Sequence, residues 1–171
     1  MSSAPQPCTD PAPVDTASVT ITITTNSQGN NPGVTGISGQ CFDINNNAIP
    51  GRNFSGMGPQ AQENLQNVTD NCYVTFVWSE PSSNPRSPVT CTEFKLFFTD
   101  QNGQQEPGPF GVIPTDFPFS TPLPSGGTLL SRVIVSGDSN WQYSGRVFTS
   151  INGATPVAQT FDPEIEVGPI D

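Results

Sequence analysis

The sequence predicts an all-β fold: a single-domain antiparallel β-sandwich, Ig-like or jelly-roll-like, with about seven or eight strands and one short connecting helix. Short segments alternate apolar and polar residues, and turn-forming residues separate them, with 19 Pro and 16 Gly in the chain. Only 12% of the residues are charged, so the chain lacks the long Ala-, Leu-, Glu- and Lys-rich runs of helical bundles. A length of 171 residues suits one domain with its own core.

The first residues differ in composition from the rest. Residues 1–16 hold four prolines and almost nothing apolar, which predicts an extended, polyproline-like N-terminal arm ahead of a β-sandwich domain at 17–171. We expect the cysteine of this arm to reach another subunit or to stay free, rather than to join the core. The start of the chain shows neither the basic residues nor the apolar stretch of a signal peptide. The residues of this assembly arm are Cys8, Pro5, Pro7, Pro11 and Pro13.

The first half of the domain contains the clearest strand. Residues 18–25 place an apolar side chain at every second position and a hydroxyl side chain between them, which is typical of a half-buried strand. A weaker strand, interrupted by glycines, is expected at 34–42, with a loop over 43–50. The one helix that we expect lies at 59–68, where apolar residues recur at helical spacing after Pro59.

The second half alternates strands and proline-rich loops. Residues 72–78 are apolar on both faces, which predicts a central strand, and 92–98 alternate strictly. Asn102-Gly103 is a hairpin-turn signature, and 104–127 read as a long loop or an edge strand. Three further strands are expected at 129–135, 141–151 and 161–167.

The charge of the chain excludes several functions. Fifteen acidic residues face five Lys and Arg, which gives a formal net charge of −10, and the cations are scattered singly. A nucleic-acid partner is therefore not expected, because phosphate recognition needs a basic stripe. No stretch approaches the roughly 18 apolar residues of a membrane span, so membrane insertion is not expected either. The chain has no His, which removes the commonest general base and zinc ligand.

The four cysteines leave two interpretations open. Their spacing matches no zinc motif, and their even number allows three disulfide pairings in an oxidising compartment. The alternative is that they are small buried side chains in a reducing cell. The candidate disulfide residues are Cys8, Cys41, Cys72 and Cys91.

The sequence gives little support for a metal site or a catalytic site. Asp43, Asn45 and Asn47 have the spacing of oxygen ligands for calcium, but the turning glycine and the bidentate Glu of such loops are missing. A pair of carboxylates, Glu164 and Glu166, shares one face of a strand, where a solvated surface explains them better than glycosidase chemistry. We therefore expect no enzyme, no metal and no cofactor.

Aromatic residues suggest one binding alternative. Sandwich folds can present aromatic rings as platforms for sugars, with amides making the polar contacts. Core packing is the competing interpretation of the same side chains. The candidate sugar platform is Trp78, Trp141 and Tyr143.

The function that these observations favour is a non-enzymatic structural subunit that self-associates, as in a surface appendage, fibre, coat or sheath. Its partners would be copies of itself, and its location extracellular or at the cell surface. We expect the arm, or the strand at 18–25, to add hydrogen bonds at a sheet edge of a neighbouring subunit. The alternative is a carbohydrate-binding or adhesin-like module.

Overall fold

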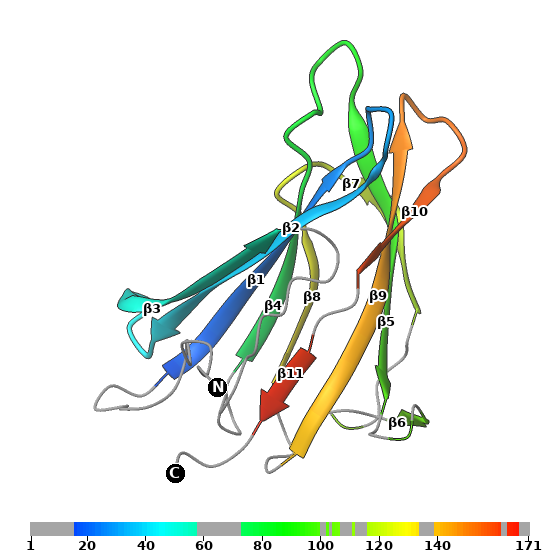
Figure 1. Ribbon diagram of the computed structural model, residues 1–171. Coiled ribbons are helices and arrows are strands. Elements are labelled where there is room, and N and C mark those ends of the chain that lie inside the picture. The colour runs from blue at the N-terminus through cyan, green and yellow to red at the C-terminus, as the bar shows by residue number, and fades with distance from the viewer. Residues whose placement is uncertain are drawn as a thin grey trace.

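The computed structural model describes residues 16–57, 73–99, 102, 104–106, 111, 116–133, 139–161 and 164–167. These residues form two facing β-sheets, so the predicted β-sandwich is confirmed (Figure 1). They contain no helix; the helix expected at 59–68 lies outside the described residues. None of their elements is a helix long and apolar enough to cross a membrane.

One sheet has five strands in the order β3-β2-β1-β4-β8. All neighbours in it are antiparallel except β1 and β4, which run parallel from the pair Ser18 and Tyr73 to the pair Thr24 and Ser79. A sandwich that is antiparallel throughout was expected, so this pair is a departure. The strands are β1 (Thr16–Asn26), β2 (Gly33–Asp43), β3 (Ala48–Met57), β4 (Tyr73–Ser79) and β8 (Thr128–Val133).

The other sheet has six strands, all in antiparallel pairs. Its main path is β10-β9-β5-β6, with β11 also paired to β9 and β7 also paired to β5. Together the sheets hold eleven strands in the described part of the chain, more than the seven or eight expected. The strands are β5 (Val89–Thr99), β6 (Gln105–Glu106), β7 (Asp116–Leu123), β9 (Ser139–Ile151), β10 (Val157–Phe161) and β11 (Glu164–Val167).

The extra strands come from segments whose sequence reads as loop. The expected loop at 43–50 includes the first residues of β3, because the turn between β2 and β3 is short. The segment 104–127 contains both β6 and β7. The hairpin expected at Asn102-Gly103 agrees with the pairing of Thr99 with Gln105.

Strand β1 lies inside its own sheet. It pairs with β2 on one side and with β4 on the other along most of its length. Residues 18–24 are therefore paired on both sides within the chain, and the expectation that this strand could dock on a neighbouring subunit is wrong for this structure. The arm ahead of it lies outside the described residues, except for Thr16, which already belongs to β1.

The core lies between the two sheets and is built from the inward positions of the alternating strands. Phe94 of β5 is at its centre, with ring centroids 5.8 Å from Phe76, 6.1 Å from Phe117 and 6.1 Å from Phe161. Gly145 lets the Phe161 ring approach, because a β-carbon there would lie 2.5 Å from the ring. The alternation read from the sequence is thus the alternation of core and surface.

Candidate functional site

The outer face of the five-stranded sheet carries no charged side chain among its described residues. The strand register places hydroxyl and amide side chains side by side across it, and Thr75 and Ser131 on adjacent strands are hydrogen-bonded at 2.9 Å. A few apolar and aromatic side chains interrupt this pattern. We call this surface the neutral face; it consists of Ser18, Thr20, Thr22, Thr24, Gly36, Ser38, Gln40, Phe42, Asn53, Tyr73, Thr75, Val77, Ser79, Ser131 and Val133.

A shallow hollow of about 480 Å³ lies on the neutral face. It follows an irregularity in the pairing of β2 with β3 between Gln40 and Phe42. The amide of Gln40 donates to the carbonyl oxygens of Cys41 and Ile49 at 2.9 and 3.3 Å, which fixes this side chain in the hollow. The lining residues are Thr20, Thr22, Ser38, Gly39, Gln40, Phe42 and Asn53.

The loop with calcium-like spacing is a turn stabilised by its own carboxylate. The Oδ1 atom of Asp43 accepts the backbone N–H of Asn45 at 2.9 Å and that of Asn47 at 3.0 Å. Asn46 between them has a positive φ of 63°, a conformation that Asn tolerates. Within the described ranges, no group of three or more His, Cys, Asp or Glu is placed to hold a metal ion.

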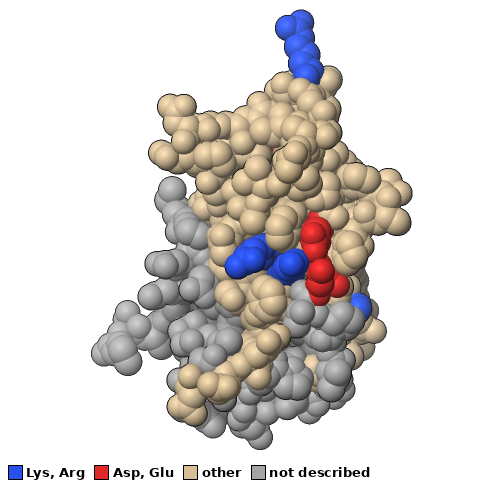
Figure 2. Space-filling view, turned by 90° about the vertical axis from the view of Figure 1, so that its right-hand side faces the viewer, with Lys and Arg blue, Asp and Glu red and all other residues tan. Residues whose placement is uncertain are grey.

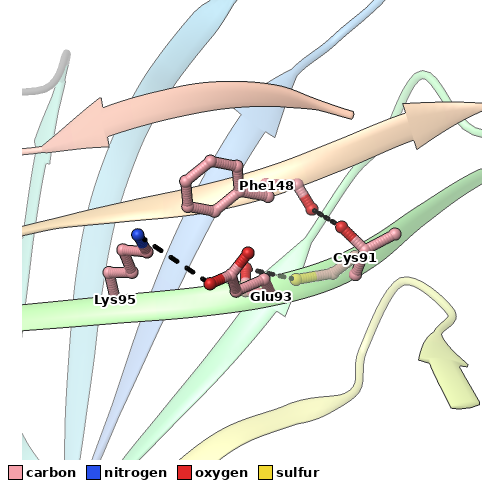
Figure 3. Close-up of polar contacts among 5 residues, drawn as sticks. Cys91, Glu93, Lys95 and Phe148 are labelled. Carbon is pink, nitrogen blue, oxygen red and sulfur yellow. Dashed lines mark hydrogen bonds and ion pairs between the residues drawn. The ribbon is translucent and has the colours of Figure 1, made fainter. Parts of the chain in front are cut away.

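The outer face of the six-stranded sheet is different, because charges gather on it. Figure 2 shows acidic and basic side chains beside one another near its middle. The Lys95 ammonium nitrogen lies 3.9 Å from a Glu93 carboxylate oxygen and 5.5 Å from the centroid of the Phe148 ring (Figure 3). In the strand register, Lys95 is opposite Asp116 of β7 and Arg146 of β9. A hydrogen bond with Asp116 raises the pKa of Glu93, as do its desolvation and the charge of Asp116, while Lys95 opposes the shift.

A buried carboxylate lies at one end of the sandwich. Glu80, just after β4, is 1% exposed and has no basic residue among its hydrogen-bond partners. Its oxygens accept hydrogen bonds from the Thr25 hydroxyl at 2.8 Å, from the Ser27 backbone N–H at 3.1 Å and from the Ser27 hydroxyl at 2.6 Å. The Ser82 hydroxyl is a further donor. Neutral donors thus compensate for the lost hydration of the charge.

This network continues into both sheets. The Trp78 indole N–H donates to the Thr25 hydroxyl oxygen at 2.8 Å, which places β4 beside the end of β1. On the other side, the hydroxyls of Ser27 and Thr149 are 2.7 Å apart, which links the loop after β1 to β9. The Gln159 amide of β10 lies 3.3 Å from the same Thr149 hydroxyl. The carboxylate therefore joins the two layers of the sandwich through polar contacts.

The two described cysteines differ. Cys91 of β5 is a free thiol with no exposed surface, and burial, opposed by hydrogen bonding to backbone groups, raises its pKa to about 12. Cys41 of β2 is equally buried and is disulfide-bonded, and its partner lies outside the described residues. Cys8 and Cys72, the other members of the candidate set, also lie there.

The sugar-platform residues are not brought together on an open surface. Trp78 is fully buried and hydrogen-bonded to Thr25, so it is a core residue, and its assignment to a platform is wrong. Trp141 and Tyr143 are in β9, and their side chains lie outside the described residues. The aromatics that the structure places on the neutral face are Phe42 and Tyr73.

The remaining candidate residues from the sequence, or their side chains, lie outside the described part of the chain. The arm residues Cys8, Pro5, Pro7, Pro11 and Pro13 lie outside the described part of the chain. Glu164 and Glu166 belong to β11, which pairs with β9, and their side chains are likewise outside it.

Comparisons with known proteins do not assign the chain to a family. No family model matches the chain, and no match to a curated protein is found.

We predict that Glu80→Gln lowers the free energy of unfolding by roughly 3 kcal/mol, because an amide N–H₂ replaces an acceptor that faces buried donors. Glu93→Gln is the matched control. The raised pKa of Glu93 means that its charged form is unfavourable in the folded state, so the control should be neutral or slightly stabilising at pH 7. That gain should vanish in acid, where the carboxyl is protonated.

Urea unfolding of both variants at pH 7 and at acid pH measures these differences. A Glu80→Gln variant as stable as the wild type would show that the buried carboxylate does not hold the two layers together.

Proposed function

We propose that the protein is a non-enzymatic structural subunit that self-associates, of the surface-appendage, fibre, coat or sheath kind. The neutral face is the observation that carries this proposal. A net charge of −10 makes copies of the chain repel one another wherever acidic side chains meet. A face without charges allows two copies to approach without that repulsion, and depletion of charge is typical of the centres of protein interfaces.

The edge of the same sheet supports a role for the arm. β8 is the last strand in the sheet order, and no second neighbour is found for it among the described strands. An edge of this kind presents backbone N–H and C=O groups that accept an added strand. We propose that residues 1–16 of a neighbouring copy pair with β8. A head-to-tail contact of this kind propagates into a ring or a filament.

The positions of the prolines fit such pairing. Pro5, Pro7, Pro11 and Pro13 all have odd numbers. Because successive residues of an extended chain direct their N–H groups to opposite sides, these prolines would remove donors from one side only. The even-numbered residues keep their donors on the other side. An arm of this composition would pair with one strand and block the addition of another.

We propose an extracellular or cell-surface location for this assembly. The disulfide at Cys41 supports it, because such bonds persist in oxidising compartments and are rare in the cytosol. The low proportion of charged residues and the abundance of hydroxyl side chains are compatible with this location.

A charge placed on the neutral face should prevent association. We predict that Thr22→Glu weakens self-association at least about tenfold, or ~1.4 kcal/mol, because each copy then adds an acidic residue to the interface. Thr160→Glu is the matched control, since Thr160 is exposed on β10 in the other sheet. Sedimentation velocity measures the effect, with circular dichroism to verify the fold. Equal association of the two variants would contradict the proposal.

The pairing side of the arm can be tested with one added proline. We predict that Gln6→Pro abolishes association, because it removes a donor from the even-numbered side. Thr9→Pro, on the side where the prolines already stand, should leave association unchanged. Sedimentation velocity of the two full-length variants compares them directly. If both behave as the wild type does, the arm does not pair with an edge.

The hollow favours carbohydrate binding as a second candidate function. Hydroxyl and amide side chains surround Phe42 there, and sugar rings combine stacking on an aromatic ring with hydrogen bonds to such groups. The neutral charge of the lining suits uncharged sugars. This ligand would occupy part of the surface that self-association would also use.

We predict that Phe42→Ala removes binding to any glycan that the wild type retains on a glycan array, because the ring is the aromatic residue of the hollow. Tyr73→Ala is the control, since Tyr73 is 54% exposed on the same face but does not line the hollow. A wild-type protein that binds no glycan, or a Phe42→Ala variant that binds normally, would exclude this candidate.

A further inference from the structure

We propose that copies of the chain stack end to end, with Arg86 of one copy bound to carboxylates at the opposite end of the next. This contact rests on the self-association proposed above and gives it a direction. The neutral face would join copies side by side, whereas this contact joins the two ends of the sandwich. The described residues at the two ends carry opposite charges, which favours such stacking.

One end of the sandwich carries a single exposed charge. Several loops lie side by side there, at the top of Figure 1, and Glu80 joins two others through hydrogen bonds with Ser27 and Ser125. Their only charged residues are the buried Glu80 and the exposed Arg86, so we call this the Arg86 end. The loops are 27–32, 80–88, 124–127 and 152–156.

The loop that carries Arg86 is held in one conformation by hydrogen bonds. The Oδ1 atom of Asn84 accepts the backbone N–H of Arg86 at 2.9 Å and that of Ser87 at 3.0 Å. The Gln28 side-chain amide donates to the carbonyl oxygen of Ser87 at 2.9 Å, which fastens the loop to its neighbour. A partner that binds here therefore has little backbone to order, and the entropy cost of association is low.

The Arg86 side chain is available to a partner. It is exposed, and no described acidic side chain forms an ion pair with it. Figure 2 shows a basic side chain projecting from the top of the molecule, with no acidic side chain beside it in this view. The planar guanidinium group presents a fork of N–H donors that matches a carboxylate, and Arg is enriched among the residues that dominate binding energies.

The opposite end of the six-stranded sheet supplies carboxylates. Glu106 lies in β6 and Glu164 and Glu166 lie in β11, the outer strands of the row β6-β5-β9-β11. The pair Thr99 and Gln142 joins the two strands between them. We call this the carboxylate end. The strand segments that form it contain no Lys or Arg; they are 96–99, 105–106, 139–144 and 164–167.

The direction of the strands makes this stacking compatible with docking of the arm. β1 runs parallel to β4, which leads into the Arg86 loop, so Thr16 at the start of β1 is at the carboxylate end. β8 runs antiparallel to β4, so its first residue, Thr128, is at the Arg86 end. In an end-to-end stack, an arm that leaves one copy therefore meets the beginning of β8 in the next and can run antiparallel to it.

Reversal of the charge of Arg86 tests the contact. We expect Arg86→Glu to weaken self-association at least about tenfold, because like charges would then face each other. Arg146→Glu is the matched control, since it changes the net charge equally at an exposed position of β9, away from the Arg86 end. Sedimentation velocity of the full-length variants measures association, and circular dichroism verifies the fold. Equal association of the two variants would overturn the proposal.

A mixture of two variants tests which ends meet. A variant with both Glu164→Arg and Glu166→Arg reverses the charge of the carboxylate end, so alone it should associate as weakly as Arg86→Glu does. An equimolar mixture of these two variants should associate at least about tenfold more tightly than either alone, because each contact between unlike copies brings opposite charges together. If the folded variants gain nothing from mixing, the assignment of the two ends is wrong.

Failure of this contact can be told apart from failure of the proposed function. If the wild type stays monomeric, both proposals are wrong. If Thr22→Glu weakens association and Arg86→Glu does not, the neutral face keeps its role and the end-to-end contact is wrong.

Discussion

The buried carboxylate of Glu80 constrains how the two layers of this sandwich meet. An isolated charge in a protein interior is strongly unfavourable, so its position must be one where several donors converge. Here the donors come from Thr25 and Ser27 at the end of β1 and from Ser82 after β4. Through Ser27 the contact reaches Thr149 in the opposite sheet. A shift of one layer relative to the other would separate these donors from the charge.

The two outer faces of the sandwich divide the charged residues unequally. The six-stranded sheet displays Glu93, Lys95 and Arg146 on its surface, whereas the described neutral face has none. Alternation within a strand sets only whether a side chain points inward or outward; it does not require the two outward faces to differ. The proposed self-association rests on this difference between the two described faces.

The sequence predicts where the strands lie much better than it predicts which strands pair with one another. The alternation around Ile21 and around Leu96 is a local signal, and both residues are buried as it indicates. Parallel pairing of β1 with β4 has no local signal, since the two strands are far apart in the chain. The hollow also escapes prediction, because it depends on an irregular register between β2 and β3.

Glu80 belongs to a candidate site, yet it was not among the residues that the sequence singled out. It continues the inward alternation of Val74, Phe76 and Trp78, so the sequence already placed it on the core side. The strand expected from the sequence ends at residue 78, however, so Glu80 lies beyond it. A carboxylate in phase with an apolar stripe, with hydroxyl residues abundant elsewhere in the chain, is the signal that would have identified it.

The central position of β1 has a consequence for synthesis of the chain. Its partner β2 follows at once, but β4 begins only at Tyr73. At about 5–20 residues per second, a ribosome needs several seconds to supply that second partner. During this interval the side of β1 that pairs with β4 lacks a partner for its backbone N–H and C=O groups. A nascent chain that ends before Tyr73 therefore has a free edge on β1 to which another strand could add.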